Sequence, residues 1–463
     1  MYTIVSKNKQ DYRAGFLYKF GQKMAIGGEK MMPDAMVIAF VLLLIVFVCG
    51  ILFTDSDPLD MINYGVDNMW SLATFACSAS LSMAFATVLS QTRVMQKFLN
   101  GLCSIPKTPV QAIVFGCFLS AVAMWVNWAV AYVLGGLYCV TVAKKVKGVD
   151  YPLLVASCYA TDMIWHPGFS GTIPLVASTE GSFIAEIVGY SIPVSETMFS
   201  PLNVTFCIIA ICTLPLLARA LMPPKEEAII ANFEVETVEE DFSLPKDKSV
   251  SGVDKLEYSR VLSLAVGVGI LVYDIMYFAR TGLNGLTLDA LNLVLLAFAL
   301  IFVRNMHEFI AHIPDAIKSA WAILVQYPFY AVISGMAAES GLASLVTDFF
   351  ASICTAGTLP NVLHLSASLV NLFIPGAGSQ FAVEAPMYIP AAQKLGASIP
   401  TVLNVAAMGD ALTNLVQPMW ALPFLAYAKL PVKKIIGYCA VFCLYGFILT
   451  QILIVIFVHM GLA

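Results

Sequence analysis

Charged residues are scarce in this sequence. Only 12% of its 463 residues are Asp, Glu, Lys or Arg, and 59% are hydrophobic, whereas a soluble domain carries roughly 25% charged residues. Together with a mean hydropathy of +0.82, this scarcity excludes a large soluble enzyme and indicates an integral membrane protein. The apolar runs, roughly 20 residues long, do not alternate in polarity as barrel strands do, so they predict membrane-spanning helices.

The sequence also lacks the motifs that several chemistries require. None of its 11 cysteines belongs to a C-x-x-C pair, and most lie in apolar runs, which favours core residues over metal ligands or disulfides. No P-loop or redox motif supports an ATPase or an oxidoreductase. Around Asp162 and Asp410 the Tyr-Asp and Gly-x-Gly-Asp patterns of intramembrane aspartyl proteases are absent, which makes that activity a remote alternative. We expect no enzyme activity, no cofactor and no nucleic-acid partner.

Basic residues predict the topology, because Lys and Arg are enriched in cytoplasmic loops. They gather before the first apolar run and at Lys107, Lys144–Lys147, Arg219 and Lys429–Lys434. We therefore expect about nine crossings and two hairpins, with a cytoplasmic N-terminus and an external C-terminus. The predicted crossings are 34–53, 69–90, one from 152 that is interrupted at 166–174, 202–217, 261–279, 286–302, 319–336, 400–427 and 436–458. The crossing 400–427 is itself predicted to be broken around NLVQPMWALP (414–423).

The same pattern divides the chain into four parts. We expect a cytoplasmic N-terminal arm at 1–33, a first transmembrane repeat at 34–222, an acidic cytoplasmic linker at 223–256 and a second transmembrane repeat at 257–463.

Two apolar stretches are predicted to enter and leave the membrane on the same side. Residues 109–142 have basic clusters at both ends, which favours a helical hairpin with a turn near Trp125–Trp128 over the alternative of one tilted helix. Residues 361–395 form the second predicted hairpin, entered from outside. Its tip contains the stretch Asn371–Pro386 (NLFIPGAGSQFAVEAP), in which Pro375 and two glycines interrupt a helix.

The two halves repeat the same order of features. Pro152 precedes Asp162 by ten residues, and Pro400 precedes Asp410 by ten. Matched segments have opposite predicted orientations, and paired, Gly/Pro-interrupted segments of this kind indicate the midplane site of a secondary transporter. The predicted fold is therefore an all-α polytopic membrane protein with two inverted repeats, broken helices and re-entrant hairpins.

The predicted spans contain almost no Lys or Arg. An anionic substrate must therefore be met by half-helix N-termini, hydroxyls, amides or a bound cation. Asn127 and Asn371 stand beside predicted breaks, and Gln326-Tyr327-Pro328 is predicted to interrupt a further span and to line the cavity. For single Ser and Thr residues, bonding to a carbonyl of the same helix is the alternative. The predicted substrate-binding residues are Asn127, Ser170, Gly171, Thr172, Gln326, Asn371, Gly376, Gly378, Ser379, Gln380, Asn414 and Gln417.

Three acidic residues in the spans indicate coupling to a cation. Asp162, Glu384 and Asp410 would repel a carboxylate unless Na⁺ or H⁺ neutralises them, although each is alternatively a solvated or paired group near a cavity mouth. His166 is a candidate for a proton relay, or else a cap for the break beside it. We expect coupling through Asp162, His166, Glu384 and Asp410, with a Na⁺ site near Asn127, Asp162, Asn371 and Asp410.

Eight short motifs are distributed along most of the chain. They are KTPVQ (107–111), VNW (126–128), DYPLL (150–154), GFSGTIPL (168–175), LVQYPFYA (324–331), VNLFIP (370–375), IPAAQKLGA (389–397) and QPMWALP (417–423). Together they resemble the bacterial short-chain fatty acid transporter family, which belongs to the ion-transporter superfamily. The resemblance implies an elevator mechanism, a homodimer in the lipid of the bacterial inner membrane, and transport of monocarboxylates such as acetate, butyrate or acetoacetate. Another small anionic or zwitterionic metabolite is the alternative substrate, and a passive channel is a remote alternative.

Both predicted binding tips depart from this family. GAGSQF (376–381) stands where the family has a glycine-rich turn that ends in His-Trp, and His166-Pro167 stands where glycines are expected. Glu384 replaces an expected amide. We therefore expect substrate choice to depend on these tips.

Overall fold

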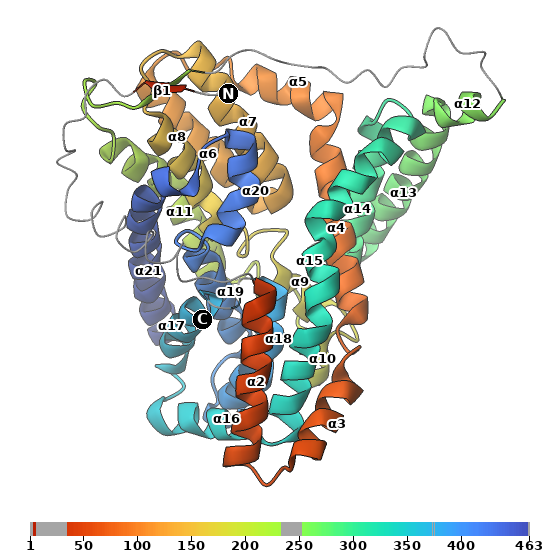
Figure 1. Ribbon diagram of the computed structural model, residues 1–463, viewed down its shortest axis with the longest axis vertical. Helices are drawn as coiled ribbons and strands as arrows, with labels where there is room; N and C mark the ends of the chain where they lie inside the picture. Colours follow the sequence, from red (N-terminus) through yellow and green to blue (C-terminus); the bar gives the residue numbers. More distant parts are fainter. Residues whose placement is uncertain (1–2, 6–34, 233–251, 373, 375, 462–463) are drawn as a thin grey trace.

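The computed structural model describes residues 3–5, 35–232, 252–372, 374 and 376–461 (Figure 1). Within these ranges nearly all regular structure is helical, and six helices are long and apolar enough to cross a membrane. A polytopic, all-helical fold is thereby confirmed. The six are α4 (Ala73–Gln91), α6 (Pro109–Val126), α11 (Pro201–Ala220), the helix 252–285 that contains α13 (Arg260–Thr281), α15 (Met306–Glu339) and α21 (Ile436–His459).

Several helices start at a polar residue followed by proline. Asp57, Thr108 and Ser200 each accept a hydrogen bond from a backbone N–H of the first turn. The following Pro58, Pro109 or Pro201 occupies the first helical position, where no intrahelical donor is needed. These pairs fix where α3 (Pro58–Asn68), α6 and α11 begin.

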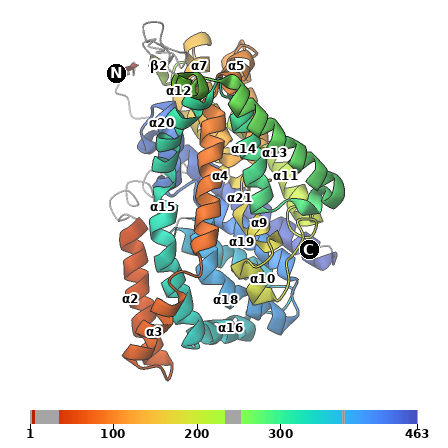
Figure 2. The same cartoon turned by 90° about the vertical axis from the view of Figure 1, so that its right-hand side faces the viewer.

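The helices form two bodies. One body, which we call the limb, consists of helices that pack around α15. Figure 2 shows α4 lying beside α15. The limb consists of α2 (Ala35–Phe53), α3 (Pro58–Asn68), α4, α13, α14 (Leu288–Phe302) and α15, with the short α12 (Gly252–Glu257) and η2 (Gly282–Gly285) at the ends of α13.

The second body, which we call the core body, surrounds the largest buried apolar cluster. It contains both predicted hairpins and both predicted broken helices, and most of it lies on the left of Figure 1, with α9 and α10 nearer the centre. Its elements are α6, α7 (Trp128–Lys145), α8 (Tyr151–Tyr159), η1 (Ala160–Ile164), α9 (Thr172–Ser178), α10 (Phe183–Val188), α11, α17 (Leu359–Asn371), α18 (Ala377–Leu395), α19 (Ile399–Thr413), α20 (Pro418–Ala428), η3 (Val432–Lys434) and α21.

Two short amphipathic helices connect the bodies at opposite ends. α5 (Arg93–Leu102) leads from α4 to α6 at the top of Figure 1, and α16 (Leu342–Ile353) leads from α15 to α17 at the bottom. The chain thus passes between the limb and the core body near each end of the molecule, and the two bodies also pack directly on one another through α4 with α7 and α15 with α18.

Both hairpins form as predicted. α6 and α7 are separated by Asn127 alone and lie antiparallel, with the Tyr138 hydroxyl donating to the Ala112 carbonyl at 2.8 Å. This pairing excludes the single tilted helix. α17 and α18 form the second hairpin, although Pro375 at its tip lies outside the described residues. In Figure 1 the first hairpin lies in the upper half and the second in the lower half.

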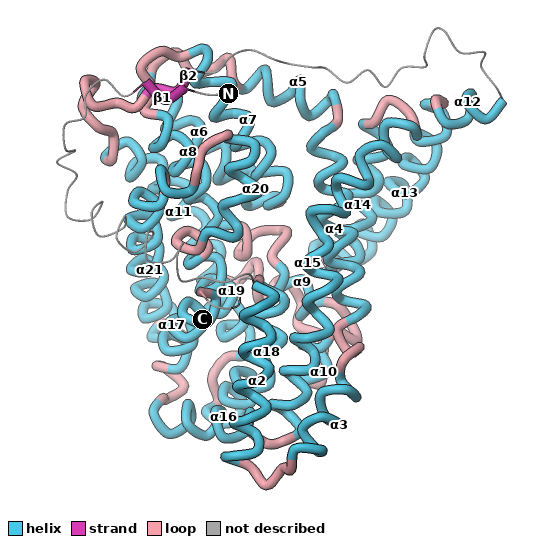
Figure 3. Tube along the Cα trace, viewed as in Figure 1, coloured by secondary structure: helices cyan, strands magenta, loops and turns pink. Residues whose placement is uncertain are grey.

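Both predicted helix breaks also form, at 165–171 between η1 and α9 and at 414–417 between α19 and α20. Figure 3 shows loop segments near the middle of the molecule, around α9 and between α19 and α20. At membrane depth such backbone is tolerated only where it is buried in protein or lines a cavity. The predicted interruption at Gln326–Pro328 is wrong, because α15 continues as one helix of 34 residues through Pro314 and Pro328.

Parts of the predicted N-terminal arm and linker lie at one end of the core body. β1 (Thr3–Val5) pairs antiparallel with β2 (Ile230–Asn232). The adjacent Ile229 donates to Asp150 at the start of α8. This contact places both segments beside the basic end of α7, which agrees with their predicted common side. The remainder of the arm, and residues 233–251 of the linker, lie outside the described residues.

Candidate functional site

The first hairpin tip is hydrogen-bonded to the first helix break. Phe169 N–H donates to the Trp125 carbonyl at 2.7 Å, and Trp128 N–H donates to Ser170 Oγ at 3.1 Å. Asn127 Oδ1 accepts from the N–H groups of Ala129 and Val130, both at 3.1 Å, and so caps α7. Its side-chain oxygen therefore serves the helix in this structure.

Two glycines make this junction possible. A Cβ atom on Gly168 would lie 2.3 Å from the Trp125 carbonyl oxygen, and one on Gly171 would lie 1.9 Å from the His166 carbonyl oxygen. Both distances are too short for a Cβ atom, so no side chain fits at either position. The GFSG sequence is thus required for the close contact between the break and the hairpin.

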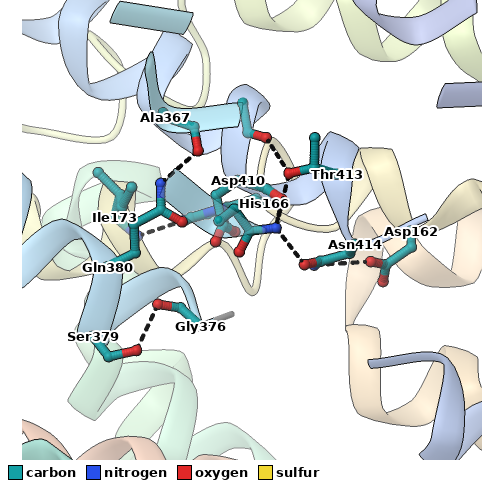
Figure 4. Close-up of polar contacts among 12 residues, drawn as sticks. Asp162, His166, Ile173, Ala367, Gly376, Ser379, Gln380, Asp410, Thr413 and Asn414 are labelled. Carbon is teal, nitrogen blue, oxygen red and sulfur yellow. Dashed lines mark hydrogen bonds and ion pairs between the residues drawn. The ribbon is translucent and has the colours of Figure 1, made fainter. Parts of the chain in front are cut away.

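The second hairpin is joined to the second break by Asn371. Its amide Nδ2 lies 2.7 Å from the Asp410 carbonyl oxygen, 3.0 Å from Thr413 Oγ1 and 2.8 Å from Asn414 Oδ1 (Figure 4). Three acceptors around one NH₂ group fix the orientation of the amide. Asn371 Oδ1 is buried without a hydrogen-bond partner among the described residues.

Asp162 continues this network to the first break. Its Oδ1 accepts from the Tyr132 hydroxyl at 2.8 Å, and its Oδ2 accepts from Asn414 Nδ2 at 3.1 Å. Asp162 itself is only 1% exposed. Asn371, Asn414 and Asp162 therefore form one continuous chain of hydrogen bonds between the two halves.

His166 and Asp410 form a second link between the halves. His166 Nδ1 lies 3.0 Å from Asp410 Oδ2, and its Nε2 accepts from the N–H of Ile173 at 3.0 Å. Because Nε2 acts as an acceptor, the proton resides on Nδ1 and points at the carboxylate. His166 thus caps α9 and contacts Asp410 at the same time, while a proton relay through it stays a prediction.

Glu384 is buried inside the second hairpin. Its Oε1 accepts from Gln380 Nε2 and lies near the Tyr388 hydroxyl, both at 3.0 Å. Gln380 Nε2 also donates to the Ala367 carbonyl at 2.9 Å, which fixes the orientation of that amide. Glu384 Oε2 has no hydrogen-bond partner within the described chain.

Four buried oxygens in this region have no hydrogen-bond donor among the described residues. They are Asn371 Oδ1, Gln380 Oε1, Glu384 Oε2 and Asp410 Oδ1, and we call them the acceptor cluster. All four belong to α17, α18 and α19, which pack against one another. Buried acceptors are normally hydrogen-bonded, so this surplus of acceptors requires an explanation.

A cavity of about 310 Å³ lies between the limb and the core body. The limb contributes residues of α4, α14 and α15, including Gln326 and Tyr327. The core body contributes the start of α18 at Gly376–Ser379 and both breaks. No Lys or Arg lines it in the described part of the chain. The core-body lining residues are Trp128, Tyr132, Asp162, Trp165, Ser170, Thr172, Gly376, Ala377, Gly378, Ser379, Asn414, Trp420 and Pro423.

The predicted site residues divide into two groups. Those that line the cavity are Asp162, Ser170, Thr172, Gln326, Gly376, Gly378, Ser379 and Asn414. The others lie outside its lining, as supports or in the acceptor cluster: Asn127, His166, Gly171, Asn371, Gln380, Glu384, Asp410 and Gln417. Of the four residues predicted to surround Na⁺, Asp162, Asn371 and Asp410 share one network, whereas the side-chain oxygen of Asn127 caps α7.

Sequence reasoning missed the aromatic part of the cavity wall. Trp128, Tyr132, Trp165 and Trp420 all line it, and the Trp165 ring stacks on His166 with centroids 4.4 Å apart. The position of these tryptophans in the sequence could have indicated their role. Tryptophan in membrane proteins is enriched at the two interfaces, whereas these residues adjoin breaks in the middle of spans.

The Asn127 cap gives a first testable prediction. Asn127→Ala is expected to destabilise the protein by about 1 kcal/mol, since it removes the acceptor for two N–H groups of α7. Asn127→Ser retains a capping oxygen and should recover most of that loss. Thermal unfolding in detergent measures both. Equal stability of the alanine and wild-type proteins would contradict the capping role.

Comparison with known proteins identifies relatives over nearly the whole chain. A family model described as "Short chain fatty acid transporter" matches residues 16–460. A "Putative short-chain fatty acid transporter" of Escherichia coli is 34% identical and covers 93% of this chain and 97% of its own length. A protein with the same description from Haemophilus influenzae is 33% identical, with 89% and 93% covered.

Two solved structures share the fold. The YdaH transporter of Alcanivorax borkumensis, described as having an unusual topology, superposes with a TM-score of 0.62 at 18% identity and covers 93% of this chain and 99% of its own. MtrF of Neisseria gonorrhoeae, described among antimetabolite efflux pumps, gives a TM-score of 0.55 at 14% identity, with 95% and 97% covered. At these identities the likeness establishes the fold. From the family match and the curated relatives, the chain belongs to the short-chain fatty acid transporter family and is a membrane transporter, not an enzyme.

Proposed function

We propose that this protein is a cation-coupled symporter for short-chain fatty acids or similar small monocarboxylates, with Na⁺ or H⁺ as the coupling ion. It would lie in the bacterial inner membrane with its N-terminus in the cytoplasm and its C-terminus outside. The observation that carries the proposal is the acceptor cluster, which lies next to the cavity and contains more buried acceptors than donors.

The surplus of acceptors favours a bound cation or proton. Asn371 and Gln380 have their amide NH₂ groups fixed by protein acceptors, so turning either amide around would replace good hydrogen bonds by repulsions. Asp410 already receives the Nδ1 proton of His166 on one oxygen. A hard cation prefers carboxylate and amide oxygens, and a proton on Glu384 or Asp410 would turn an acceptor into a donor.

The cavity and the cluster are connected in two ways. Asn414 lines the cavity and accepts from Asn371, whose own Oδ1 belongs to the acceptor cluster. Trp165 lines the cavity and stacks on His166, the partner of Asp410. Occupation of one site can therefore change the geometry of the other, which coupling between substrate and ion requires.

The carboxylate is proposed to bind at the start of α18. The first N–H groups of a helix have no intrahelical partner and carry a partial positive charge. Gly376, Gly378 and Ser379 bring this helix end to the cavity wall. Ser170 of the first break and Thr172 at the start of α9 line the same cavity. These groups replace the Lys or Arg that the described lining lacks.

The division into limb and core body supports an elevator mechanism. The proposed substrate and ion groups belong almost entirely to the core body, whereas Gln326 and Tyr327 belong to the limb. The opposite placement of the two hairpins agrees with inverted repeats. Movement of the core body along the limb would carry both ligands. A homodimer is proposed from the family resemblance, and native mass spectrometry in detergent would test it.

Glu384→Gln is the most specific test of coupling. The change keeps the size of the side chain and an acceptor for Tyr388 but removes its ability to ionise. We expect uptake of labelled butyrate into proteoliposomes to lose most of its dependence on the driving gradient, with a fall of about tenfold or more in accumulation, because a buried carboxylate that binds a cation or proton is lost. Glu186→Gln on the exposed face of α10 is the matched control. Full gradient-driven accumulation by the Glu384→Gln protein would remove Glu384 from the mechanism.

A further inference from the structure

Tryptophan dominates the apolar part of the cavity wall. Four of the six tryptophans in the chain line it: Trp128, Trp165 and Trp420 from the core body, and Trp321 from α15 of the limb. The Trp128 ring lies 5.7 Å from that of Trp420 and 6.3 Å from that of Trp165, between centroids. The rings are therefore gathered in one place.

Trp128 packs edge-to-face against Trp165 and Trp420, and these ring pairs are not stacked in parallel. The interplanar angle is 80° between Trp128 and Trp420 and 62° between Trp128 and Trp165. Tyr132 extends the same wall, with its ring 5.6 Å from Trp128 at an angle of 78°. Edge-to-face contacts of this kind are favourable among aromatic rings, and a further ring in the cavity can make the same contacts.

The cavity is also larger than a short-chain fatty acid. Its volume of about 310 Å³ is many times the roughly 10–15 Å³ that a cavity needs to hold one water. Butyrate has six non-hydrogen atoms, whereas phenylacetate has ten. A cavity that held butyrate alone would leave much of the aromatic wall in contact with water, and that contact is unfavourable for apolar surface.

The polar groups of the cavity fit one carboxylate. α18 is a helix of 19 residues, and its start at Gly376–Ser379 is suited to binding one anionic group. No basic side chain among the described lining residues could bind a second anionic group. Asp162, at the opposite wall, would repel a second carboxylate. These features select against dicarboxylates and leave the wide, aromatic side of the cavity for an uncharged tail.

We propose that the cavity prefers monocarboxylates with a flat or bulky apolar tail, arylcarboxylates above all, to the short straight-chain acids. The inference rests on the proposed function of the same cavity as a carboxylate carrier. Trp128 and Trp420 are the residues that determine this preference. The carboxylate lies at the start of α18 and the ring of the substrate lies against the tryptophans.

The test compares phenylacetate with butyrate on the full-length protein in proteoliposomes. We expect phenylacetate to inhibit the uptake of labelled butyrate at a concentration about fivefold lower than unlabelled butyrate does, since one well-placed aromatic contact gives a gain of this order. Labelled phenylacetate should itself accumulate. Trp420→Leu and Trp128→Leu should each bring the ratio of the two inhibitory concentrations toward one, whereas Trp70→Leu, on an exposed site away from the cavity, should leave it unchanged.

The outcomes separate this inference from the proposed function. If butyrate uptake occurs but phenylacetate inhibits it no better than unlabelled butyrate does, the aryl preference is overturned and the carrier function remains. Absence of gradient-driven uptake for both acids would overturn both. If the tryptophan variants do not fold, the increase in the melting temperature of the wild-type protein with each acid still tests the aryl preference. A larger shift with phenylacetate at equal concentration supports the inference, and an equal or smaller shift contradicts it.

Discussion

Asp410→Asn is expected to reduce ion-coupled uptake by about tenfold to 100-fold. A hydrogen bond to a charged group contributes roughly 1.5–3 kcal/mol, and each 1.4 kcal/mol corresponds to a factor of about ten. Asp410 is 1% exposed, contacts His166 with one oxygen and contributes its other oxygen to the acceptor cluster. Asparagine keeps the size of the side chain but removes the charge that a bound cation would neutralise.

The control for Asp410 is an aspartate with a partner at the surface. Asp348 lies 2.7 Å from Lys394, and both side chains are more than half exposed. Such a pair contributes about 0–1 kcal/mol, so Asp348→Asn should leave uptake within about twofold. Measured gradient-driven uptake decides between the two. An Asp410→Asn protein that is folded and as active as the Asp348→Asn protein would show that the buried pair has a structural role alone.

Gly378→Ala is expected to slow transport by about tenfold or more. A Cβ atom at this position would lie 2.5 Å from the Tyr327 hydroxyl oxygen and 2.6 Å from Phe75 Cε1. Gly378 belongs to the core body, whereas Tyr327 and Phe75 belong to the limb, so the overlap falls where one body would move past the other in the proposed elevator mechanism. Overpacking of this kind costs roughly 1–3 kcal/mol.

Two further variants show where the effect arises. Gly269→Ala on α13 has no atom within 4 Å of the new Cβ and should transport normally. Phe75→Leu combined with Gly378→Ala shortens one of the obstructing side chains and should recover part of the rate. Initial rates of uptake at saturating substrate are the appropriate measurement. An unimpaired Gly378→Ala protein would contradict a close sliding contact between the two bodies.

The hairpins and helix breaks could be predicted because proline and glycine act locally. A proline removes a backbone donor wherever it stands, so 166–174 and 414–423 were recognisable as breaks, and the structure breaks the helices at 165–171 and 414–417. The same rule failed at Pro328, where α15 continues as a helix. α15 packs against α4 and against α18 of the second hairpin. These tertiary contacts override the local tendency of a proline to break a helix.

The direction of individual side chains could not be predicted. Asn127 and Asn371 were expected to bind substrate because an amide at membrane depth needs partners, and both have partners within the protein itself. At a break no helical period specifies which way a residue points. The same limit concealed the tryptophan wall, since Trp128, Trp165 and Trp420 come from three separate segments that only the folded core body brings together.

One measurement tests the central proposal most directly. Purified protein in proteoliposomes is given labelled butyrate with an imposed Na⁺ gradient, an imposed pH gradient, or neither. The proposal predicts accumulation above the external concentration with at least one of the two gradients and none without a gradient. Equilibration of butyrate at the same rate under all three conditions would identify a passive pathway and contradict cation-coupled transport.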